Sequence, residues 1–249
     1  SFGGAVVVVN DQRTTEVLLD TFDGETAGDP GAGIDPWEDP TPPDYAVHAL
    51  HEGTLDAGLR AGAGSDGGLA GDVSVGTVTT GWRTAVALDD VSLTYGGTID
   101  IAATEAARLT NLQRAMTTAG KGAGTIGVAV TTYDSVVDTS LAAVNLETFD
   151  PDPLAGDGAG PITVTATSDS TLRTKSVRSG EGKVAAGVTV NETRALGETS
   201  VHFGPGVYKG DGFSFESGSG TFGGAVTIAA TDSTWREVVA SSSGTADAV

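Results

Sequence analysis

Clustered carboxylates in two Gly-containing segments are the residues of this chain best suited to chemistry. Asp150, Asp152 and Asp157 fall in one segment, and Asp23 and Asp29 fall in a related one that also begins Thr-Phe-Asp. Hard oxygen ligands on flexible loops are what Ca²⁺ prefers. The spacing matches no complete calcium motif. The sequence therefore predicts two candidate Ca²⁺ loops and no other cofactor, with solvated acidic loops as the alternative.

The remaining polar residues give no catalytic constellation. His48 and His51 are three residues apart, which places them on opposite faces of a strand and argues against a shared metal. Polysaccharide lyases and hydrolases need paired carboxylates with basic helpers, whereas Arg108, Arg173 and Arg236 recur near corresponding strands and are expected to decorate the surface. We predict no enzyme activity and no catalytic residue.

A Pro-rich insertion at 35–44 carries the one candidate binding residue outside the acidic loops. Its Trp37 stands among Pro, Asp and Glu residues. Pro-rich segments are extended and semi-rigid, so we expect Trp37 either to contact a partner or to pack back on the body of the protein.

Composition restricts the partners and the compartment. The formal net charge is −20, from 33 acidic and 13 basic residues among 249. Such a surface repels phosphate backbones and anionic lipid, so we expect neither nucleic acid binding nor membrane insertion. The chain has no Cys, which excludes disulfides and thiolate sites and is compatible with bacterial export.

Internal repeats are the strongest signal and give the elements that must carry these residues. The segment 127–141 aligns with 187–201 without a gap, and a further copy starts at Gly71. The two ends also match each other, as Phe2–Val6 and Phe222–Val226. Equivalent aliphatic residues are expected to stack in a ladder: Val75, Val130 and Val190. Because the alternation is Val-x-Val, we expect Val188 and its equivalents to face the core.

A second motif recurs between these copies. Ile99-Asp-Ile-Ala-Ala-Thr precedes Leu109, and Ile162-Thr-Val-Thr-Ala-Thr precedes Leu172 at the same distance. The segment 102–119 also has some helical character, but its match to the segment ending at Leu172 predicts a strand. Only Phe213-Ser-Phe215 remains at the corresponding place in the fourth unit.

These patterns predict an all-β fold, a right-handed parallel β-helix (β-solenoid), with antiparallel β-sandwich repeats as the alternative. In a solenoid, coils stack about 4.8 Å apart and like residues form ladders. With about 20 residues per coil, each repeat would hold two or three coils. We expect one continuous segment over 1–249. Its units are approximately 1–67, 68–122, 123–182, 183–219 and 220–249, with loop insertions at approximately 22–44 and 149–161.

Neither end of the chain resembles the atypical cap that terminates natural solenoids. We therefore expect the stack to continue, through further repeats or through copies of the chain docked end to end.

Two phrases resemble the repeats of large bacterial filamentous adhesins, the leukotoxin-type and filamentous-haemagglutinin-like exoproteins. They are the run from Phe2 to Asn10 and the run from Gly182 to Asn191. The Asn is replaced by Gly76 and Thr131 in the other copies. The resemblance implies an exported, β-helical shaft at the bacterial cell surface that serves in attachment, and it carries no catalytic residues. Host or cell-surface glycans would then be the further candidate partners. The alternative is a β-helical carbohydrate-active enzyme or carbohydrate-binding module.

Overall fold

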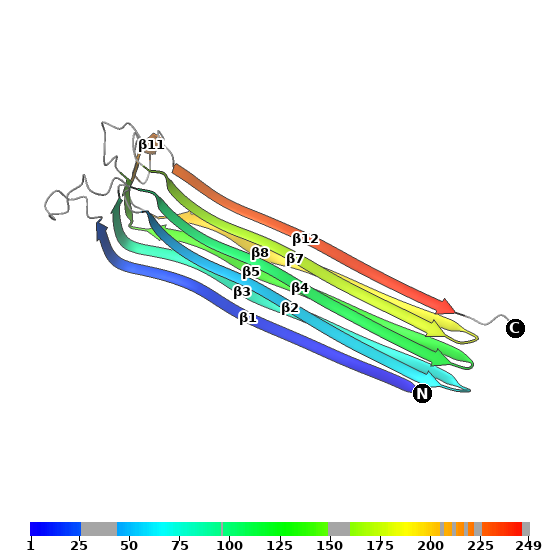
Figure 1. Ribbon diagram of the computed structural model, residues 1–249. Helices are drawn as coiled ribbons and strands as arrows, with labels where there is room; N and C mark the ends of the chain where they lie inside the picture. Colours follow the sequence, from blue (N-terminus) through cyan, green and yellow to red (C-terminus); the bar gives the residue numbers. More distant parts are fainter. Residues whose placement is uncertain are drawn as a thin grey trace.

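The chain folds into two stacked sheets of long parallel strands, in a computed structural model (Figure 1). The structure describes residues 1–25, 44–95, 97–148, 160–204, 207–210, 213–216, 219–221 and 226–245. No helix occurs in these ranges. This is the all-β, solenoid-type architecture expected from the repeats, and the parallel pairing disagrees with the antiparallel sandwich alternative. The handedness of the coil stays a prediction.

Successive long strands alternate between the two sheets. Sheet A holds β1 (Phe2–Glu25), β3 (Leu69–Tyr95), β5 (Gly122–Ala142) and β8 (Ala185–Phe203), all paired in parallel. Sheet B holds β2 (Tyr45–Ser65), β4 (Ile99–Ala119), β7 (Ile162–Glu181) and β12 (Val226–Thr245), also parallel. Each level of the stack therefore contains one strand from each sheet.

Short strands extend sheet A beside the long ones. They are β6 (Asn145–Thr148), β9 (Val207–Gly210), β10 (Phe213–Glu216) and β11 (Ser219–Thr221). The first two continue the parallel ladder beside β3, and the last two add an antiparallel edge. The Phe213–Phe215 motif belongs to this antiparallel edge. The motif was expected to follow the Ile99 and Ile162 segments in their ladder. In sheet B that position, next to β7, is occupied by β12 instead.

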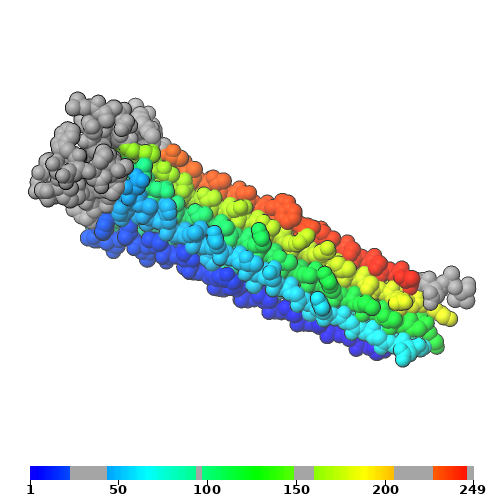
Figure 2. All heavy atoms as spheres, in the orientation of Figure 1, coloured from blue at the N-terminus to red at the C-terminus, as the bar shows by residue number. Residues whose placement is uncertain are grey.

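The coils are wide, which corrects the expected coil of about 20 residues. A strand of 20 residues spans about 66 Å, whereas four levels stack to only about 14 Å. Each coil contains two such strands, so one sequence repeat makes one coil. In the space-filling view the levels run as long stripes ordered from blue to red (Figure 2).

The register agrees with two predicted pairs and corrects one predicted ladder. Ile99 pairs with Ile162, and Leu109 pairs with Leu172, as the recurring motif predicted. In sheet A, Val75 pairs with Val128 and Val128 with Val190. Val130 therefore lies two residues away from the ladder in which it was placed.

The two matching ends of the chain are not stacked where the structure describes them. The Phe2–Val6 copy is part of β1 in sheet A, whereas Val226, the described residue of the other copy, begins β12 in sheet B.

The two sheets bury their facing sides, and this reverses the predicted orientation of the Val-x-Val segments. Val73, Ile126 and Val188 form an outward ladder and are about half exposed, Val188 being 58% exposed. The buried positions of the same strands hold small and polar residues, such as Ser74 and Gly127. Both faces of a strand repeat with period 2, so alternation by itself did not identify the inner one.

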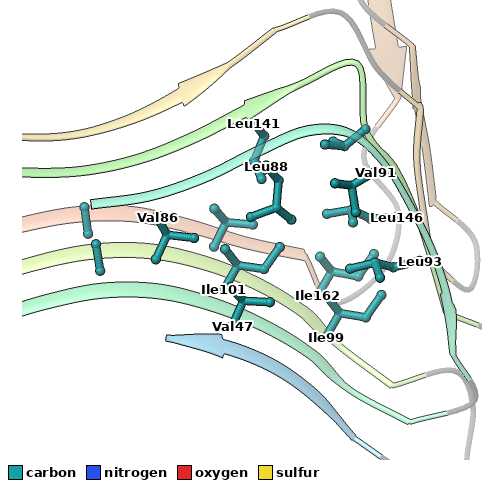
Figure 3. Close-up of a cluster of buried hydrophobic side chains, with 14 of the residues drawn as sticks. Val47, Val86, Leu88, Val91, Leu93, Ile99, Ile101, Leu141, Leu146 and Ile162 are labelled. Atoms are coloured by element: carbon teal, nitrogen blue, oxygen red, sulfur yellow. The ribbon is translucent and has the colours of Figure 1, made fainter. Parts of the chain in front are cut away.

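An apolar core fills one end of the space between the sheets (Figure 3). Val86, Leu88 and Leu141 from sheet A meet Ile101 and Ile162 from sheet B, each 1% exposed or less. Towards the other end the interior becomes polar and then narrows to a small cluster of Ala side chains. The stack is thus held by a conventional core at one end and by buried hydrogen bonds along the remainder.

A stacked corner on sheet A lies within this core, which continues beyond it through Val91, Leu93 and Leu146. Thr21, Asp90 and Ala143 have φ of 52°, 52° and 53° and lie at equivalent positions of successive levels. Left-handed backbone is uncommon for residues with a side chain. Its recurrence on three levels shows that the corner is a constant feature of the coil, and the strands bend near this end in Figure 1.

Candidate functional site

The predicted calcium and binding residues fall almost entirely outside the described part of the chain. Asp29, Trp37, Asp150, Asp152 and Asp157 all lie in ranges that the structure does not describe. Asp23 is the exception: its backbone belongs to β1 and pairs with Ser92. Within the described ranges, no group of three or more His, Asp or Glu side chains is arranged to hold a metal ion. The calcium loops remain predictions.

The two His residues of β2 lie on opposite faces, as their spacing predicted. His48 is exposed and lies 2.8 Å from a carboxylate oxygen of Asp100 on the neighbouring strand. His51 points between the sheets, where its Nδ1 lies 3.1 Å from the hydroxyl of Thr15. They share no metal site.

The interior holds a fully buried carboxylate that sequence reasoning did not single out. Glu105 on β4 occupies an inward position between Ala103 and Ala107 and is 0% exposed. Its side chain accepts hydrogen bonds from Ser135 Oγ at 2.5 Å and from Thr84 Oγ1 at 3.1 Å. In the sequence, Glu105 alternates with Ala103 and Ala107 on one face of the strand. That pattern could have identified Glu105 as an inward carboxylate.

Tyr133 completes the environment of this carboxylate. Its phenolic hydroxyl donates to Oε1 of Glu105. Burial raises the pKa of Tyr133 well above its ordinary range, and the hydrogen bond and negative charge of Glu105 raise it further. Three hydroxyls of sheet A therefore donate to Glu105 of sheet B, and this carboxylate joins the two sheets.

A small cleft opens above this cluster, between the last strands of the two sheets. Its volume is about 80 Å³, and Tyr133 and Ser168 line it from the third level. Asp232 and Arg236, at inward positions of β12, provide the charges, and Glu198 borders the cleft from an outward position of β8. Asp232 accepts a hydrogen bond from Thr234 Oγ1 at 3.0 Å. Among the described residues, no carboxylate forms an ion pair with Arg236.

The opposite edge of the stack carries a complementary polar group. Arg13 on β1 forms an ion pair of 2.7 Å with Asp11, and its guanidinium carbon lies 4.9 Å from the ring centroid of Trp82. The His51 ring lies 4.9 Å from the Trp82 ring, with 52° between the planes. Edge-on contact of Trp82 with Tyr133 at 6.0 Å then continues this row of rings to the third level.

A buried arginine and a buried aspartate, Arg178 and Asp72, lie nearer the end of the interior that holds the Ala cluster. Arg178 on β7 is 1% exposed, and its Nη2 donates to Oε1 of Gln113 at 2.8 Å. Burial lowers the pKa of Arg178, and burial raises the pKa of Asp72, while the charge of each opposes the shift of the other. Gly127 faces Arg178 so closely that a Cβ there would overlap the guanidinium. Because Gly127 has no side chain, the Arg178 guanidinium fits between the sheets.

The three recurring Arg residues do not occupy one ladder. Arg108 pairs with Thr171, and Arg173 pairs with Thr110 and with Glu237. Both face outward, whereas Arg236 stands at the cleft. They do not form the row of basic helpers that a polysaccharide-cleaving groove requires.

Comparisons with known proteins give no family and no relative. A scan against protein-family models, a search of curated proteins and a search of solved structures each returned no match. The described residues also include no helix that could cross a lipid bilayer. Function must therefore be argued from the geometry alone.

Proposed function

We propose that this chain is a structural and adhesive module of an extracellular bacterial surface filament or giant adhesin, stacked end to end with further repeats. The observation that carries the proposal is that both outer levels of the stack have an unpaired strand edge in the part of the chain that the structure describes. There, β1 and β2 each pair with one strand at the first level, and β8 and β12 do so at the fourth.

Open edges of this length are unusual for a protein that works alone. Each edge strand has about 20 residues, and an exposed edge of that length is a template for a further strand. Natural solenoids otherwise end in polar caps. Within the described ranges neither outer level is covered by another segment, so continuation of the stack is the arrangement that satisfies these backbone groups.

The acidic surface and the absence of Cys fit a cell-surface location. A net charge of −20 keeps an extended assembly soluble. The resemblance of the Val-x-Val-Asn phrases to filamentous adhesin repeats supports the same compartment. Attachment itself would be made through outer faces and loops, with cell-surface or host glycans as the candidate ligands.

The proposal is tested on intact cells that produce the protein. Antibodies raised against the chain should label the outside of unpermeabilised cells, and mild external protease should remove the signal. Immunogold labelling should mark extended surface structures. A signal that appears only after permeabilisation would refute the extracellular assignment.

A carbohydrate-active enzyme is the second candidate, and the cleft is the observation that favours it. Asp232 and Arg236 bring an acidic and a basic group to one opening. Against it, the deeper carboxylate of Glu105 is held by hydrogen bonds from three hydroxyls, and the cleft is small. Purified chain incubated with a panel of acidic and neutral polysaccharides should release no reducing ends. Release that is abolished in Glu198→Gln or Asp232→Asn would favour the enzyme.

A further inference from the structure

The cleft at the fourth level and the charged group at the first level are complementary, and their positions are related by the register of the stack. We infer that the β8–β12 edge of one copy binds the β1–β2 edge of a second copy in register, with Arg13 of the second copy entering the cleft beside Asp232. This inference rests on the proposed function, because it specifies the end-to-end contact of that assembly.

The register of the four levels fixes which residues would meet. Arg13 stands in the ladder of Trp82, Ser135 and Gly197, and Asp11 stands in the ladder of Thr80, Tyr133 and Ala195. On sheet B, the ladder of His51 contains Glu105, Ser168 and Asp232, and the ladder of Leu55 contains Leu109, Leu172 and Arg236. A fifth level in the same register would repeat the first.

Charge complementarity supports this occupant. In that register Arg13 lies over Gly197, which contributes no side chain, and His51 lies over Asp232. Asp11 of the second copy lies over Ala195, on the side of the cleft where Arg236 stands. The guanidinium of Arg13 on one edge thus meets the carboxylate of Asp232 on the other, and Arg236 gains a carboxylate partner.

Apolar residues of the two edges would also meet each other at the end of the stack that holds the apolar core. Val201 on β8 and Ile228 on β12 occupy inward positions at the edge of the fourth level. In register they would lie against Val17 and Val47 of the second copy. Since Val17 and Leu19 already pack against the core from the first level, docking would make the core continuous across the junction.

Such a contact joins two different surfaces, so it does not close on itself. Head-to-tail contacts that do not close produce open fibres. The expected product is therefore a fibre whose axis is perpendicular to the strands, with a spacing of about 4.8 Å carried through each junction.

Charge exchange between two variants tests the contact. Arg13→Glu places a carboxylate against Asp232, and Asp232→Arg places a guanidinium against Arg13, so each variant alone should require at least a tenfold higher concentration than the unaltered chain to assemble. An equal mixture should assemble again, because the carboxylate introduced at position 13 then meets the guanidinium introduced at position 232. Arg108→Glu, an outer-face variant of the same charge change, should assemble normally. Sedimentation velocity over a concentration series measures all four.

Cysteine cross-linking provides a readout that does not depend on weakening the contact. Leu18 and His202 are exposed and belong to one outward ladder of sheet A, so in-register docking brings their Cα atoms to about the 4.8 Å that a disulfide can span. The chain has no native Cys. Leu18→Cys with His202→Cys should form covalent ladders on oxidation, and Leu18→Cys with Glu192→Cys, about ten residues out of register, should not.

The outcomes separate this inference from the function on which it rests. An unaltered chain that stays monomeric at every concentration, a mixture of folded charge variants that fails to assemble, or equal cross-linking in both Cys pairs would overturn the docking register. The surface-labelling experiment would still stand in those cases. In-register ladders formed by a protein found only inside cells would retain the docking and refute the surface filament.

Discussion

At the scale of single residues, the interior of this protein departs from an apolar core. Glu105, Gln113 and Arg178 are buried between the sheets, and Glu105 and Gln113 are 0% exposed. Each faces either a hydrogen-bonding side chain or a glycine on the other sheet. Gly76 faces Gln113, for example, and the Gln113 side-chain amide donates to the Gly76 carbonyl oxygen at 3.2 Å. Buried polar groups are tolerated when they are satisfied, and a satisfied network specifies one register over its neighbours.

Removing the central carboxylate should therefore be costly. Glu105→Ala leaves the hydroxyls of Thr84, Tyr133 and Ser135 without their acceptor, and we expect a loss of about 2–4 kcal/mol in the free energy of unfolding. Glu105→Gln retains one acceptor oxygen and should lose less. Urea denaturation measures both, with Glu52→Ala on the outer face as the matched control expected within about 0.5 kcal/mol of the unaltered chain. Equal stability of all three variants would contradict the assigned role.

The buried Asp72 should give the protein a specific pH dependence. Its carboxylate oxygens have no hydrogen-bond donor among the described residues, and burial raises its pKa above the ordinary value of 3.8. The folded state therefore binds a proton more readily than the unfolded state. Stability conferred at this site should increase as pH falls from neutral towards about 4 and decrease as pH rises.

Asp72→Asn removes that titration. The difference in unfolding free energy between Asp72→Asn and the unaltered chain should be largest at about pH 7 in favour of the variant, and it should shrink towards about pH 4.5. Asp169→Asn, at an exposed position of β7, provides the comparison. A difference that does not change with pH would show that the carboxylate is not buried as described.

At the scale of elements, the corner of sheet A combines a constant geometry with residues poorly suited to it. Three levels place a residue with a side chain in left-handed backbone, and the alternation of burial restarts after it. In the fourth level β8 ends at Phe203, and the N–H of Gly204 donates to the Leu141 carbonyl oxygen at 2.5 Å. Over the first three levels the geometry persists while the residue type varies, which indicates that the sheet imposes the corner.

Glycine should improve this corner. Ala143→Gly removes the Cβ from a position with φ of 53° and should stabilise the protein by about 0.5–1 kcal/mol, because left-handed backbone costs residues with a side chain roughly that much. Ala142→Gly, one residue earlier and at the end of β5, should instead destabilise it by a similar amount. Thermal unfolding measures the change in stability of both variants. A change of the same sign in both would exclude backbone strain at this corner.

At the scale of the whole molecule, the decisive fact is which side of each strand faces the opposite sheet. The aliphatic ladder of Val73, Ile126 and Val188 faces outward, while Val164 and its equivalents face inward. A wide, flat body with two open edges and an aliphatic outer strip has more than one surface available for assembly. Charged side chains such as Arg13 and Asp232 lie at the edges, whereas the strip carries aliphatic side chains.

A charge at these two kinds of position should have opposite consequences. Val188→Asp, at a position 58% exposed, should change the free energy of unfolding by less than about 1 kcal/mol. Val164→Asp, at a position 1% exposed, should prevent folding because it buries an unpaired carboxylate. Circular dichroism and proteolysis of the purified variants distinguish them. Unfolding by Val188→Asp would restore the inward orientation that the sequence alone suggested.

The sequence by itself determined the all-β class, the parallel stacking of repeats and the pairing of Ile99 with Ile162 and of Leu109 with Leu172. Those features follow from local alternation and from recurrence, which are properties of the chain itself. Only the tertiary structure decided which face is buried, how long a coil is, and that Glu105 stands at its centre. The physical reason is that a strand has two equivalent faces, and the opposite sheet chooses between them by what it can satisfy: Gly127 admits Arg178, and three hydroxyls hold Glu105.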